Sequence, residues 1–194
     1  MSIQNICIKF YASEGTTIDQ DQLIGVFQRW IREQALEGVL IDIADYRHVP
    51  EGPGMMLIAH NLNYAMDEAE GGRLGVLAQR KRPQEGDHKS RILGVVEPTL
   101  KFIAALEASP ELADSLKIDL TSFEYIANDR LRVANDDAAL QSIEADLIAA
   151  GEQLYGNSVS ISRRNNHPKA RLAVSVSTGG VAGDCKTLLA NIAQ

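Results

Sequence analysis

Residues able to transfer protons lie close together in the stretch from Asp42 to Tyr64. Asp45 and His48 stand near its start and His60 near its end, which makes the three candidate catalytic residues. A histidine titrates near neutral pH, and a neighbouring carboxylate can orient its ring as an acid or a base. Such a pair requires the side chains to meet in the fold, and spacing along the chain does not establish that they do.

The same stretch carries groups suited to binding an anion. Arg47 has the planar guanidinium that pairs with a carboxylate or phosphate through two parallel hydrogen bonds. The bend Gly52-Pro53-Gly54 lets backbone amides approach a ligand closely. The candidate ligand-binding residues are Arg47, His48, Gly52, Gly54, His60 and Tyr64. A rigid strand connection whose polar groups cap the backbone explains the same residues without a ligand, and the sequence leaves both interpretations open.

Other kinds of site lack their motifs. The spacing of the histidines matches no zinc pattern, and the acids at 67, 68 and 70 lack the order of a calcium loop. The glycine-rich segment 178–183 leads into a helix, but Asp184-Cys185 precede the lysine that a nucleotide loop places directly after glycine. We expect Asp184 to cap that helix, and we expect neither a metal nor a cofactor.

Basic residues gather in two places, around residues 80–91 and residues 163–171. Neither cluster is interleaved with aromatic residues that could stack on bases, and the chain has a net charge of −7, which repels nucleic acid. The clusters therefore indicate either a solvated face or the rim of a site for an anionic ligand. We expect no nucleic-acid partner.

The composition is that of an ordinary globular protein, and we expect a single domain over residues 1–194 with sub-halves 1–82 and 88–194. No apolar run approaches the roughly 20 residues that span a bilayer, and the first residues alternate as in a strand rather than a signal peptide. We therefore expect a cytoplasmic protein without a membrane partner. The two cysteines, Cys7 and Cys185, are expected to be buried thiols.

Hydrophobic periodicity predicts an α+β fold, with a mixed sheet of about seven strands and about four helices. A strand over residues 3–11 precedes a helix that Thr16 or Thr17 would cap, with Thr17 and Gln20 fitting a capping box, and that Gly38 would end. Residues 39–43 are expected to form a strand covered on both faces. Later helices are predicted at 90–108, kinked at Pro98, at 136–155 after an Asn135 cap, and at 184–193. The other predicted strands lie at 55–59, 74–79, 120–126, 130–133, 159–162 and 172–177.

The order strand, helix, strand, loop, strand occurs twice, over residues 3–60 and again over residues 121–177. The loops of both segments place a histidine near a proline, at His48-Val49-Pro50 and at His167-Pro168. The sequence thus suggests two β-α-β-β halves, related either by a pseudo-twofold duplication or by the simple recurrence of α+β units.

Taken together, these features favour a binding protein for a small anionic ligand, or for a protein partner, near the loop at residues 45–64. One alternative is an enzyme of the hydrolase or transferase type that uses Asp45, His48 and His60 as acid–base residues. Another is a homo-oligomeric structural protein, in which a sheet edge or the helix at 90–108 forms a homodimer.

Overall fold

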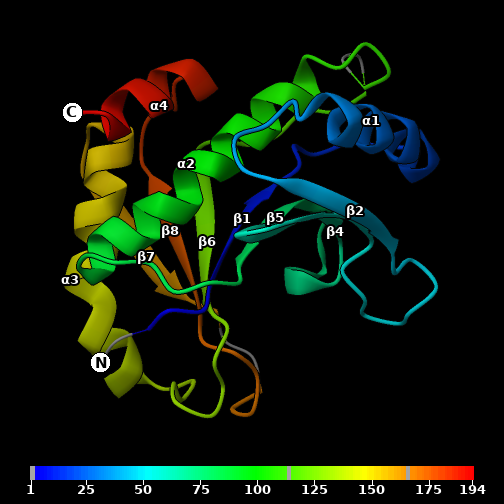
Figure 1. Ribbon diagram of the computed structural model, residues 1–194. Coiled ribbons are helices and arrows are strands. Elements are labelled where there is room, and N and C mark those ends of the chain that lie inside the picture. Colours follow the sequence, from blue (N-terminus) through cyan, green and yellow to red (C-terminus); the bar gives the residue numbers. More distant parts are fainter. Residues whose placement is uncertain (1–2, 113–114, 165–166) are drawn as a thin grey trace.

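The computed structural model describes residues 3–112, 115–164 and 167–194 and shows one antiparallel sheet with helices packed on one of its faces (Figure 1). The strands are β1 (Ile6–Tyr11), β2 (Leu40–Asp45), β3 (Met55–Ala59), β4 (Leu62–Asp67), β5 (Gly75–Arg80), β6 (Ser122–Ala127), β7 (Val159–Arg163) and β8 (Ala173–Thr178). Their spatial order is β2-β3-β4-β5-β1-β6-β8-β7. The helices are α1 (Gln20–Glu33), α2 (His88–Glu107), α3 (Asp137–Tyr155) and α4 (Cys185–Ile192).

The α+β class is confirmed, and the sheet differs from the expected one in two ways. Every pair of neighbouring strands is antiparallel, so the sheet is not mixed, and it has eight strands rather than about seven. The unpredicted strand is β4, whereas residues 130–133 form a turn rather than a strand. Acidic residues disfavour strands, but the acid at the end of β4, Asp67, is buried against the amine of Lys9.

The ends of α1 lie away from the predicted caps. The N-cap is Asp19, whose carboxylate accepts a hydrogen bond from the Asp21 amide, so the predicted cap at Thr16 or Thr17 is wrong. The helix ends at Gln34, which has a φ of 48°, rather than at Gly38. The Gln34 side-chain amide accepts a hydrogen bond from the Leu40 N–H and donates one to the Leu40 carbonyl. These two bonds hold Gln34 in the left-handed conformation, which residues other than glycine rarely adopt.

β2 is an edge strand, which corrects the prediction that it is covered on both faces. Val39 is 59% exposed and Ile41 is 51% exposed. The apolar run predicted burial because parallel strands inside a sheet have such runs, but here the run lies at the free edge of an antiparallel sheet.

The remaining helices agree more closely with the sequence. α2 continues through Pro98, as predicted, and begins after an Asp87 cap. α3 begins after Asp136 rather than Asn135 and ends at Gly156, which has a φ of 69°. Asp184 caps α4 by accepting a hydrogen bond from the Thr187 amide, as expected.

Side chains alternate between the two faces of the sheet, as strand geometry requires. On β1, Ile6, Ile8 and Phe10 face the helices and join the main core. Cys7 and its alternating neighbours Lys9 and Tyr11 point to the face without helices, called the open face below. A small apolar cluster on the open face consists of Cys7, Met56, Ala65, Leu77, Ile126 and Ala173.

The two halves meet at the centre of the sheet, where β1 and β6 are antiparallel neighbours. Beyond β1 lie β5 and β4, and beyond β6 lie β8 and β7. The β4–β5 hairpin of the first half therefore occupies the place of the β7–β8 hairpin in the second half, and β2 and β3 extend the first half outward. This layout is compatible with a twofold axis between β1 and β6, while the duplication itself stays a hypothesis.

Among the described residues, no helix combines the length and the apolar character needed to cross a bilayer.

Candidate functional site

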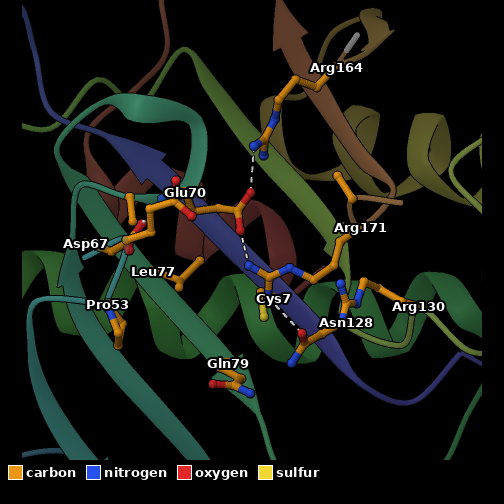
Figure 2. Close-up of a pocket in the computed structure, with 13 residues that line it drawn as sticks. Cys7, Pro53, Asp67, Glu70, Leu77, Gln79, Asn128, Arg130, Arg164 and Arg171 are labelled. Carbon is orange, nitrogen blue, oxygen red and sulfur yellow. Dashed lines mark hydrogen bonds and ion pairs between the residues drawn. The ribbon is translucent and has the colours of Figure 1, made fainter. Parts of the chain in front are cut away.

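A cavity of about 740 Å³ lies on the open face, and we call it the open-face pocket (Figure 2). Side chains from β1, β4 and β5 form its floor, and the connections that surround the sheet form its rim. Its lining residues are Cys7, Glu51, Pro53, Asp67, Ala69, Glu70, Leu77, Gln79, Asn128, Arg130, Arg164, Ala170 and Arg171.

A buried ion pair supports the pocket. The Lys9 Nζ lies 2.7 Å from Asp67 Oδ2, and it also donates to the carbonyl oxygens of Glu70, at 2.6 Å, and Arg73, at 2.7 Å. Burial lowers the pKa of Lys9 below its usual value, and the Asp67 carboxylate offsets part of that effect. Because three acceptors use the three N–H groups of the amine, Lys9 fixes the β4–β5 connection in place rather than serving as a free base.

Glu70, on the β4–β5 connection, forms ion pairs with two arginines. These come from the segment between β7 and β8, in the other half of the sheet. Arg164 Nη1 donates to Glu70 Oε1 at 2.6 Å, and Arg171 Nη2 donates to Glu70 Oε2. Arg171 Nη1 also donates to Asn128 Oδ1 at 2.7 Å. Figure 2 shows the Glu70 carboxylate lying between the two guanidinium groups. Each arginine is therefore held in a defined orientation at the pocket.

Glu124 of β6 extends this network across the sheet. Its carboxylate accepts hydrogen bonds from Arg164, with Nε 2.8 Å from Oε1, and it accepts another from the Tyr11 hydroxyl. Burial, followed by the hydrogen bond to Glu124, raises the pKa of Tyr11 well above its usual value. Tyr11 is therefore a neutral donor throughout the physiological pH range.

The charges of this network balance. The cations Lys9, Arg164 and Arg171 offset the anions Asp67, Glu70 and Glu124. Two further charged residues line the pocket without an ion pair in the described part of the chain, namely Arg130 and Glu51. Of these, Arg130 is the charge available to an anionic ligand.

The pocket floor includes one potential nucleophile, the thiol of Cys7. Burial raises the pKa of this thiol to about 12, although the nearby Arg171 partly opposes the rise. A thiol with this pKa carries negligible thiolate at neutral pH, so it acts as a small apolar group beside Leu77.

Asp45, Arg47 and His48 lie outside the pocket, on the surface at the end of β2 and in the loop that follows it. The Arg47 guanidinium pairs with Asp45, with Nη2 2.6 Å from Oδ2, and with Asp21, with Nη1 2.6 Å from Oδ1. Arg47 holds the pKa of Asp45 down at about 2, with a smaller contribution from His48. Arg47 is thus engaged with two carboxylates of the protein itself.

His60 lies at the opposite end of the β2–β3 pair. Asp45 is paired with Met55 at the start of β3, whereas the His60 amide bonds the carbonyl of Val39 beyond the other end of β2. Five residues of strand separate these ends by roughly 16 Å. The structure therefore does not bring His60 together with Asp45 and His48.

Tyr64 is buried on the helix face of β4, where its ring stacks on Phe102 at a centroid separation of 4.5 Å. The two glycines have structural roles in the loop. Gly54 has a φ of 70°, and a Cβ there would lie 2.3 Å from the Met66 carbonyl oxygen. A Cβ at Gly52 would lie 2.7 Å from the Tyr46 carbonyl oxygen. Of this loop, Glu51 and Pro53 line the pocket.

The residues of the open-face network were not predicted as a site, although several of them left a trace in the sequence. Arg164 and Arg171 belong to the basic cluster at 163–171, for which an anion-site rim was one interpretation. Asp67 and Glu70 belong to the acidic group after Tyr64. The clearest signal is Lys9, a charged residue in the middle of an otherwise apolar strand.

Within the described ranges, no three His, Cys, Asp or Glu side chains are placed to hold a metal ion. No protein-family model, curated protein or solved structure matches this chain.

Proposed function

We propose that the protein is a binding protein for a small anionic ligand, held in the open-face pocket. One observation carries this proposal: two arginines line the same pocket above an apolar floor. Arg171 is held in place by its ion pair, whereas Arg130 has no ion-pair partner in the described structure. Figure 2 places both side chains on the same side of the pocket. An arginine that is already oriented loses less rotamer freedom when it binds a carboxylate or phosphate.

The volume and lining of the pocket suit a small molecule. Ligand pockets typically have volumes of roughly 300–1,000 Å³ and combine an apolar surface with a few placed polar groups. Here Cys7 and Leu77 supply the apolar part, and the Gln79 amide lies beside them. The chain segment at residues 51–53 contributes to the rim, which keeps part of the predicted loop in the proposed site.

Binding fits the arrangement better than catalysis. Asp45, His48 and His60 do not form a shared site, and the Cys7 thiol is protonated. Apart from Arg130 and Glu51, the charged groups of the pocket are paired with one another, as in a site that positions a ligand. We therefore place the function in the binding class.

Calorimetric titration with inorganic phosphate and with succinate, using neutral succinamide as the control, tests this proposal. We expect both anions to bind and the Arg130→Ala variant to weaken binding about tenfold, which corresponds to roughly 1.4 kcal/mol. Arg132→Ala is the matched control, because Arg132 is an exposed arginine of the same turn whose nearest carboxylate oxygen is 3.8 Å away.

Two results would count against the open-face pocket. If Arg47→Ala weakens binding and Arg130→Ala does not, the ligand binds at the surface of the 45–64 loop instead. If neither anion binds more tightly than succinamide, the pocket does not recognise negative charge.

A second candidate, self-association or a protein partner at the β2 edge, is favoured by one observation. Four large exposed hydrophobic residues lie along β2 and the segments beside it: Val39, Ile41, Tyr46 and Val49. The backbone of this edge is partly capped, since Gln34 bonds Leu40 and the Asp42 carboxylate accepts from the Ile43 amide. We therefore expect a partner to contact this edge through side chains, and not by adding a strand to the sheet.

Light scattering on the wild type and on Ile41→Lys tests this candidate. A homodimer formed at the β2 edge should become monomeric in the variant, whereas a monomeric wild type excludes the homodimer. The other predicted dimer surface, the helix at 90–108, is largely covered, because α2 packs both on the sheet and against the helices α3 and α4.

A further inference from the structure

A second cavity, of about 340 Å³, lies where β4 and β5 meet α2, and we call it the Arg80 cavity. Its residues come from the α1–β2 connection, the strand ends, the β5–α2 connection and the middle of α2, so it is separate from the open-face pocket. Its lining residues are Glu37, Gly38, Val39, Ala59, Asn61, Leu62, Tyr64, Arg80, Gln84, Gly94, Glu97, Pro98 and Lys101.

Arg80 is a partly buried cation without a counterion. Its Nε donates to the carbonyl of Arg82 at 2.9 Å, and it forms no ion pair within residues 3–112, 115–164 and 167–194. Burial lowers the pKa of Arg80 below its usual value. A guanidinium removed from part of its water and given no carboxylate is a ready partner for an anion.

The other cation of the cavity, Lys101, is already neutralised. Its Nζ lies 2.6 Å from Glu37 Oε2 and 2.8 Å from Glu97 Oε1. The contrast between the two cations indicates where a ligand's negative charge belongs. It would lie at Arg80, away from the two carboxylates that flank Lys101.

Further polar groups of the cavity have no hydrogen-bond partner in the described structure. The Tyr64 hydroxyl is one, and burial raises its pKa to about 12, so it remains a donor at neutral pH. The buried Gln84 Oε1 is an acceptor without a donor. Pro98 lacks the N–H that would bond the Gly94 carbonyl one helical turn earlier, so this carbonyl loses its usual helical donor.

Apolar side chains also line the cavity. Val39, Leu62 and Pro98 line the cavity, and the Tyr64 ring is held flat against Phe102, with an angle of 3° between the ring planes. A ligand that fits must combine one acidic group with an apolar body. Multiply charged anions would meet the carboxylates of Glu37 and Glu97.

We propose that the Arg80 cavity is a second ligand site, which binds a small organic monocarboxylate. The carboxylate accepts hydrogen bonds from the Arg80 guanidinium and the Tyr64 hydroxyl, and the apolar body packs against Val39, Leu62 and Pro98. This site is independent of the open-face pocket, since it shares no lining residue with it.

The fluorescence of Trp30 provides a specific readout, because Trp30 is the single tryptophan of the chain. Its ring packs edge-on against Phe102 at a centroid separation of 5.6 Å, and Phe102 in turn stacks on Tyr64. Cyclohexanecarboxylate is a suitable probe, since it carries one carboxylate and does not absorb at the excitation wavelength. Cyclohexanecarboxamide is the neutral control of matched shape.

We expect cyclohexanecarboxylate to change the Trp30 emission with saturation and cyclohexanecarboxamide to have no such effect. The apparent Kd should rise at least tenfold in Arg80→Ala and severalfold in Tyr64→Phe. Arg82→Ala should leave it unchanged, because Arg82 is exposed and contributes only its backbone carbonyl. Arg130→Ala in the open-face pocket should also leave it unchanged.

Equal responses to the carboxylate and the carboxamide would overturn the proposal, as would a Kd in Arg80→Ala equal to that of the wild type. Loss of the response in Arg130→Ala would overturn it as well, because the probe would then bind on the open face. Circular dichroism of each variant establishes that it is folded. If Arg80→Ala does not fold, the Kd of Tyr64→Phe becomes the test. A Kd in Tyr64→Phe equal to that of the wild type would then overturn the proposal.

Discussion

Lys9 and Asp67 form an ion pair beneath the open-face pocket that solvent hardly reaches. The two residues are 0% and 2% exposed, and their charged atoms are 2.7 Å apart. The pair joins β1 at the centre of the sheet to the end of β4, two strands away. It thereby fixes the connection that carries Glu70 into the pocket.

Breaking this pair on one side should be strongly destabilising. Lys9→Met leaves the Asp67 carboxylate buried without its cation, and we expect a loss of about 3–5 kcal/mol in the free energy of unfolding. The double variant Lys9→Met, Asp67→Leu removes both charges and should lose much less than the sum of the two single variants. Urea unfolding of the four proteins measures the coupling. Additive losses would show that the two charges do not depend on each other.

Glu70 competes with an anionic ligand for the arginines of the pocket. In Glu70→Gln, Arg164 and Arg171 lose a shared negative charge, so the pocket becomes more positive. If the proposed function is right, the affinity for inorganic phosphate should rise about fivefold, equivalent to roughly 1 kcal/mol, while thermal stability falls. Glu68→Gln is the control, because it removes the same charge from an exposed neighbouring position. If the phosphate affinity of Glu70→Gln is unchanged, Arg164 and Arg171 do not contribute to ligand binding.

Gly54 should tolerate no side chain. It has a φ of 70° and lies against the Met66 carbonyl, so Gly54→Ala combines a strained backbone with a steric clash. We expect a loss of about 3 kcal/mol in the free energy of unfolding. Gly15→Ala is the matched control, since Gly15 has a φ of 81° and open space around it, and it should lose about 1 kcal/mol. Equal losses in urea unfolding would mean that the contact with Met66 relaxes without cost.

The sequence predicted the elements that depend on local periodicity. α2, with its apolar positions at helical spacing, was predicted as one helix through Pro98, and β3 was placed at its observed residues. β4 was missed because its stabilising partner, Lys9, is 58 residues away from Asp67 in the chain. No local pattern reports a neutralising contact of that kind.

The candidate site was predicted less well, for the same reason. Asp45, Arg47 and His48 are close in sequence, and the first two do pair, but on the surface. The open-face pocket instead gathers residues from β1, β4, β5 and the connections around the sheet, such as Glu70 and Arg171, which are 101 residues apart. Only the order of strands in the sheet brings them together, and that order could not be derived from the sequence.

His88, the first residue of α2, gives the protein a defined pH dependence. Its ring is buried, with Nε2 3.3 Å from the Tyr125 hydroxyl and Nδ1 without a hydrogen-bond partner in the described structure. Burial lowers the pKa of His88 below its usual value, while Asp146 acts in the opposite direction. The folded state therefore keeps His88 neutral at pH values where the unfolded chain already protonates it.

The lower pKa of His88 in the folded state determines the direction in which stability changes with pH. As the pH falls below about 6.5, the unfolded state binds one more proton than the folded state, and the free energy of unfolding decreases by at most about 1.4 kcal/mol per pH unit. His88→Gln removes this titration while keeping a polar side chain near Tyr125, so its stability should fall less steeply between pH 7 and pH 5. Urea unfolding at pH 7, 6 and 5 measures both slopes. Carboxylates contribute equally to the two proteins, so identical slopes would mean that His88 is protonated in the folded state as readily as in the unfolded chain.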